Sequence, residues 1–147
     1  MRARLMIGLA LVVVAGCGSG RKLAPVSGRV TLDGKALVGA TVSFQPIADE
    51  GALEAGIGSQ GKTNENGEFT LSTATGESGA FVGKHLVRIS LINNQVDLDK
   101  RPPRGGWPQM DLVPSRYNSD SEETFDVLPG GTDKADFPLV RTVKKPR

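Results

Sequence analysis

The sequence predicts an all-β fold, a single antiparallel β-sandwich of about seven strands. Apolar and polar residues alternate with a period of two in several short stretches, as in strands that bury one face. Turn signals, including Asp33-Gly34 and Asn66-Gly67, separate these stretches. The 147 residues include 19 glycines and 9 prolines, and no stretch shows a long helical period of apolar residues.

The first two predicted strands cover residues 25–32 and 40–46. Within each stretch the apolar residues share one parity, so they would face the core, and Gly28 leaves a gap in that face. Asp33-Gly34 supplies the positive φ angle that a tight hairpin connection needs. The side chains expected in the core are those of Val26, Val30, Leu32, Ala40, Val42 and Phe44.

Five later strands are predicted from the same signals. They lie near residues 58–63, 68–71, 84–92, 122–128 and 135–140. In the strand at 84–92, His85 shares its parity with Val87 and Ile89. We therefore expect the only histidine of the chain to be a packed side chain at the end of a sheet and not a ligand.

These motifs resemble the prealbumin-like (transthyretin-like) or carboxypeptidase-regulatory-like β-sandwich. The resemblance covers residues 26–44, V-S-G-R-V-T-L-D-G-K-A-L-V-G-A-T-V-S-F, and residues 63–71, T-N-E-N-G-E-F-T-L. Residues 113–118 are similar to a segment of bacterial lipoproteins of this type. The resemblance implies a sandwich over residues 25–141 and a basic tail at 142–147. It implies no particular activity, because such sandwiches host many functions.

The N-terminus resembles the signal peptide of a bacterial lipoprotein, covering residues 1–16. Arg2 and Arg4 precede an apolar run of 11 residues, which is shorter than the roughly 20 residues that span a bilayer. Val14-Ala15-Gly16-Cys17 looks like a lipobox, with cleavage between Gly16 and Cys17 and a lipid on the Cys17 thiol. An ordinary secretory signal cut after Ala15 is the alternative. The lipobox predicts a membrane-anchored lipoprotein of the cell envelope that faces the periplasm or the cell surface, with a flexible tether at 17–24.

The charge of the mature chain argues against nucleic acid as a partner. Removal of Arg2 and Arg4 reduces the 18 basic residues to 16, which equals the 16 acidic residues. Proteins that bind nucleic acid need a basic stripe to neutralise phosphates, and none is present here.

The residue inventory also argues against catalysis, cofactors and metals. With one histidine and one cysteine the chain lacks the parts of a Ser-His-Asp or Cys-His site or of a zinc site. Gly56-Ile57-Gly58-Ser59-Gln60-Gly61 has the spacing of a dinucleotide-binding loop but no following helix. We read the cluster of Asp120, Glu122, Glu123 and Asp126 as a solvated acidic face. We expect no catalytic residue, no cofactor and no metal.

The long segment at 93–113 is the candidate for contact with a partner. It contains three prolines, Arg104 and the only tryptophan, Trp107. The predicted function is a structural or partner-binding envelope module, whose partner is an envelope protein or a glycan. One alternative is a carbohydrate-binding module, in which soluble polysaccharide would quench the fluorescence of an exposed Trp107. The other is a small hydrolase that uses Glu122 and Asp126, which requires a concave pocket.

Overall fold

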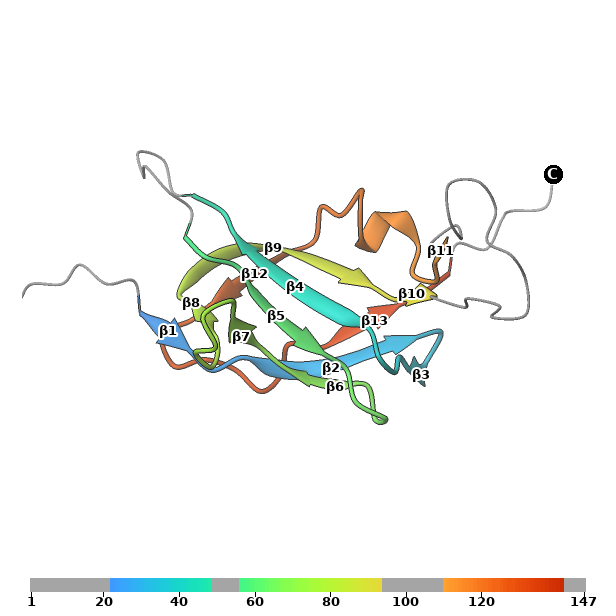
Figure 1. Ribbon diagram of the computed structural model, residues 1–147, viewed down its shortest axis with the longest axis horizontal. Helices are drawn as coiled ribbons and strands as arrows, with labels where there is room; N and C mark the ends of the chain where they lie inside the picture. The colour runs from blue at the N-terminus through green and yellow to red at the C-terminus, as the bar shows by residue number, and fades with distance from the viewer. Residues whose placement is uncertain (1–21, 49–55, 94–109, 142–147) are drawn as a thin grey trace, which may run out of the picture.

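The predicted fold class is confirmed: the chain forms an all-β sandwich (Figure 1). The computed structural model describes residues 22–48, 56–93 and 110–141. All seven predicted strands lie within them, together with six strands of two residues each. No helix of the described residues is long and apolar enough to span a membrane.

One layer is a five-stranded antiparallel sheet with the order β12-β9-β4-β5-β7. Its centre is β9 (Gly83–Ser90) paired with β4 (Thr41–Pro46) over six residue pairs. The flanking strands are β12 (Thr124–Val127), β5 (Ser59–Lys62) and β7 (Ser72–Thr73). The motif at residues 56–61 thus leads into an antiparallel strand, where no helix can receive a pyrophosphate.

The second sheet is built around β2 (Ser27–Leu32). β6 (Glu68–Thr70) and β3 (Lys35–Ala36) pair with successive parts of one edge of β2, and β13 (Phe137–Leu139) pairs with the other edge. The β13 pairing is parallel, whereas we predicted only antiparallel strands. The chain crosses from β12 to the other sheet before β13 begins, so no tight hairpin forces the antiparallel direction.

Two short ribbons close the opposite ends of the sandwich (Figure 1). β1 (Leu23–Ala24) pairs with β8 (Ala80–Phe81) at one end, and β10 (Ile92–Asn93) pairs with β11 (Met110–Asp111) at the other. A single 3-10 turn, η1 (Ser115–Tyr117), follows β11.

The sandwich includes two residues that we predicted to be part of the tether. We placed Leu23 and Ala24 in the tether at 17–24, but they form β1, and Ala24 is only 1% exposed. The Val82 N–H also donates to the Lys22 carbonyl at 2.8 Å. The backbone hydrogen bonds of β1 and the burial of Ala24 outweigh the local preference of this small-residue stretch for coil.

The core lies between the two sheets and has the expected inward faces. All six side chains predicted from the first two strands are buried. Phe44 of the five-stranded sheet meets Phe137 of the second sheet with ring centroids 6.1 Å apart, and Phe125 closes the same cluster. Gly28 is buried because the backbone of Ala135 crosses it, and a Cβ atom there would lie 2.0 Å from the Ala135 carbonyl oxygen.

The Asp33-Gly34 turn has the predicted conformation, but it connects β2 to a different strand from the one we expected. Asp33 and Gly34 have φ angles of 51° and 79°, as a two-residue hairpin requires. The hairpin joins β2 to the short strand β3, and the chain then crosses to the other sheet to form β4. The first two predicted strands, β2 and β4, therefore lie in different sheets and do not pair with each other.

Candidate functional site

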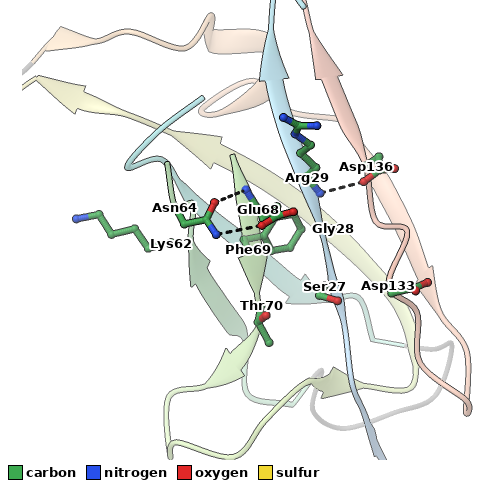
Figure 2. A pocket seen from close by; sticks show the side chains of 10 residues that line it. All are labelled: Ser27, Gly28, Arg29, Lys62, Asn64, Glu68, Phe69, Thr70, Asp133 and Asp136. Carbon is green, nitrogen blue, oxygen red and sulfur yellow. Dashed lines mark hydrogen bonds between the residues drawn. The ribbon is translucent and has the colours of Figure 1, made fainter. Parts of the chain in front are cut away.

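A polar groove runs across the outer side of the β2–β6 pair (Figure 2). Its volume is about 700 Å³. Three stretches of the chain contribute to it: β2, the stretch from the end of β5 through β6, and the segment that enters β13. The lining residues are Ser27, Gly28, Arg29, Lys62, Asn64, Glu68, Phe69, Thr70, Asp133 and Asp136.

Strand alternation and register bring the polar side chains of the groove together. Val26 and Val30 face the core, so Ser27 and Arg29 face outward from β2. The antiparallel register then sets Thr70 opposite Ser27 and Glu68 opposite Arg29. Between these pairs Gly28 lies opposite Phe69, whose side chain is only 3% exposed. Gly28 shares the inward parity of Val26 and Val30, so at this point only its backbone lines the groove.

Hydrogen bonds hold one end of the groove in a defined geometry. Asn64 Oδ1 accepts the backbone N–H groups of Asn66 and Glu68 at 2.9 Å each, and Asn64 Nδ2 donates to Glu68 Oε2 at 3.2 Å. Asp136 Oδ1 accepts the Arg29 N–H at 2.9 Å (Figure 2). Arg29 Nε donates to the Asn66 carbonyl at 2.7 Å. These bonds fix the two strand edges before any ligand arrives.

The groove offers both hydrogen-bond donors and acceptors to a ligand. Two cationic side chains, Arg29 and Lys62, line the groove together with three carboxylates, those of Glu68, Asp133 and Asp136. Such a lining suits a polar ligand with several hydroxyl or amide groups. We predicted none of these five charged residues as site residues, because the three stretches meet only through the pairing of distant strands.

The site residues predicted from sequence do not meet in this groove. Gly16, Cys17, Arg104 and Trp107 lie outside the described residues. Glu122 and Asp126 are exposed, and neither lines the groove. Within the described part of the chain, no three histidine, cysteine or carboxylate side chains are grouped so that they could hold a metal ion.

His85 is a packed side chain at the start of β9, as predicted. It is 1% exposed, and its ring centroid lies 5.8 Å from that of Phe44. Its Nδ1 atom donates to the Gly83 carbonyl at 3.0 Å, while Nε2 has no hydrogen-bond partner among the described residues. Burial lowers the pKa of His85 below 6.5, although the Gly83 carbonyl and the Asp126 carboxylate both raise it.

We expect the buried neutral His85 to make the domain less stable in mild acid. The unfolded chain takes up a proton on His85 near pH 6.5, whereas the folded chain resists it, so the unfolded state binds more protons below that pH. The free energy of unfolding should therefore be constant above about pH 6.5 and fall as the pH drops toward 5.5. Urea unfolding followed by circular dichroism at several pH values measures this slope.

The matched control for the pH dependence is His85→Phe, which keeps a ring beside Phe44 but cannot titrate. Its free energy of unfolding should be nearly flat between pH 7.5 and 5.5, where most carboxylates are already ionised. An unchanged slope in this variant would show that another group is responsible.

Comparisons with models of protein families, with curated proteins and with solved structures gave no match for this chain.

Proposed function

We propose that this protein is a lipid-anchored β-sandwich module with a structural or partner-binding role in the cell envelope. The supporting observation is the position of the only cysteine. Cys17 ends the lipobox-like Val14-Ala15-Gly16-Cys17 segment, and β1 of the sandwich begins at Leu23, only a few residues further along the chain. The five residue steps from Cys17 to Lys22 can span at most about 18 Å. A lipid on Cys17 would thus hold the sandwich close to the bilayer.

The arrangement of the strands then suggests which end of the module is free to meet a partner. β1, the strand nearest to Cys17, lies at one end of the sandwich, and the β10–β11 ribbon lies at the other (Figure 1). Asn93 and Met110 of this far ribbon flank the segment that contains Arg104 and Trp107. A partner that stands away from the membrane would meet the far ribbon and its flanking chain first.

The polar groove supports a partner-binding role more than a purely structural one. Its hydrogen-bonded carboxylates and cations are displayed on the outside of the sheet, where they add nothing to the core. A carbohydrate-binding module and a small carboxylate-dependent hydrolase stay as predictions. The groove is concave and contains three carboxylates, but its carboxylates are not the pair Glu122 and Asp126 that we predicted for a hydrolase.

The lipid anchor is tested by Cys17→Ala, with Ser19→Ala as the matched control. We expect the cysteine variant to lose incorporation of a palmitate analogue and to move from the membrane fraction to the soluble fraction, because it lacks the thiol that carries the lipid. Ser19→Ala should behave as the wild type does. A Cys17→Ala protein that stayed in the membrane and still incorporated the analogue would contradict the proposal.

Protease treatment of intact cells locates the anchored module. Degradation of the wild-type protein would place the sandwich on the cell surface, and protection would place it inside the envelope. In both cases the Cys17→Ala control shows whether the lipid is responsible for the membrane attachment.

A further inference from the structure

A small hollow lies beside β1, at the end of the sandwich that the β1–β8 ribbon occupies. It has a volume of about 120 Å³, roughly four times the ~30 Å³ that one water molecule takes in the liquid. Backbone hydrogen bonds hold its walls together. Val82 N–H donates to the Lys22 carbonyl at 2.8 Å, and Ile47 N–H donates to the Lys84 carbonyl at 2.8 Å. Lys22 and Ile47 are therefore joined to the same short run of chain, residues 82–84.

The charge in this hollow is positive. Lys22 and Lys84 both line it, and no carboxylate does. Both side chains are exposed, and neither ammonium group forms an ion pair or hydrogen bond with any described residue. The nearest carboxylate in the strand register is that of Asp126, which lies opposite Lys84 on β12. Two ammonium groups that line one hollow and have no ion-pair partner favour the binding of an anion there.

One exposed apolar side chain lines the same hollow, and a second follows a residue that pairs with the wall of the hollow. Ile47 lines the hollow and is 42% exposed. Leu128 is 65% exposed and follows Val127, which pairs with Gly83 of the hollow. The Gly131 N–H donates to the Leu128 carbonyl at 2.9 Å, so Leu128 starts a tight turn. Apolar side chains beside lysines are typical of protein surfaces that rest on a lipid interface.

From this geometry we infer that the hollow binds the phosphate of an anionic phospholipid, with Lys22 and Lys84 on the phosphate and with Ile47 and Leu128 against the lipid. The inference rests on the proposed lipid anchor, since Cys17 lies at most about 18 Å from Lys22. Each lysine near an anionic membrane surface raises the affinity of the protein for that surface about fivefold. The two contacts would orient the sandwich, so that its far ribbon points away from the bilayer.

The test measures the acylation rate of each lysine in the lipidated protein, from which the signal peptide has been removed. The protein is reconstituted in vesicles of phosphatidylcholine alone, or with one third of the lipid replaced by phosphatidylglycerol, and a short acylation pulse is read by mass spectrometry. We expect Lys22 and Lys84 to react about fivefold more slowly in the anionic vesicles. Lys35 on β3 and Lys62 on β5 lie outside the hollow and serve as internal controls with equal rates. Molar salt should remove the protection.

A charge reversal distinguishes binding at the hollow from non-specific electrostatic attraction of the protein to the membrane surface. Lys84→Glu should bring the acylation rate of Lys22 in anionic vesicles back close to its rate in neutral vesicles, whereas Lys35→Glu, outside both the hollow and the polar groove, should leave the protection of Lys22 intact. An equal loss of Lys22 protection in both variants would show that the protection depends only on the net charge of the protein, and it would overturn the assignment. Inorganic phosphate that protects Lys22 and Lys84 equally well in neutral vesicles would also overturn it, in favour of a soluble anion.

Flotation of the vesicles distinguishes this inference from the proposed anchor. If the protein carries no lipid anchor, it will float with neither the neutral nor the anionic vesicles. If the protein floats with both kinds of vesicle but Lys22 and Lys84 react at equal rates in them, the anchor stands and the headgroup site is refuted.

Discussion

Replacing Phe44 with alanine is expected to lower the free energy of unfolding by about 4 kcal/mol. Phe44 is fully buried, and its ring centroid lies 5.4 to 6.1 Å from those of Phe125, Phe137 and His85. It therefore connects the five-stranded sheet with the second sheet, and its truncation would leave a cavity that the two rigid layers cannot close. Urea unfolding followed by circular dichroism measures the difference in the free energy of unfolding between the wild type and the variant.

Two further variants make the Phe44 prediction specific. Phe44→Leu retains most of the buried volume and should cost much less than Phe44→Ala. Phe81→Ala removes the same side chain from the short strand β8, where the phenylalanine is only partly buried. A loss in Phe81→Ala as large as that in Phe44→Ala would contradict the central role of Phe44.

Gly28→Ala should destabilise the domain by about 3 kcal/mol, although it adds a single methyl group. A Cβ atom at this position would lie 2.0 Å from the carbonyl oxygen and 2.4 Å from the carbonyl carbon of Ala135. Both atoms belong to the backbone, so no side-chain rotation can relieve the clash. The segment that enters β13 would have to move away from β2, which also disturbs the bond from Ala135 N–H to the Ser27 carbonyl.

The matched control is Gly130→Ala, because a Cβ atom at Gly130 has no neighbour within 4 Å and its φ angle is not positive. We expect this variant to change the free energy of unfolding by at most about 0.5 kcal/mol. If Gly28→Ala were as stable as Gly130→Ala in urea unfolding, the close approach of Ala135 would not exist in solution.

The candidate site was much less predictable than the fold. The alternation along β2 and β6 predicts that Ser27, Arg29 and Glu68 face outward, but exposure alone does not distinguish a groove from an ordinary surface. The groove also needs Asp133 and Asp136, which are more than 100 residues away from Arg29 in the sequence. No local pattern encodes that juxtaposition.

The sequence by itself determined the fold class, the inward faces of the strands and the conformation of the Asp33-Gly34 turn. These features depend on the preferences of neighbouring residues, which a period of two and a pair of turn residues express directly. Only the tertiary structure decided that β13 pairs in parallel with β2, that Leu23 and Ala24 belong to the domain, and that Lys22 and Lys84 flank one hollow. Each of these depends on contacts between residues far apart in the chain, whose free energy is shared among many partners and leaves no signal at any single position.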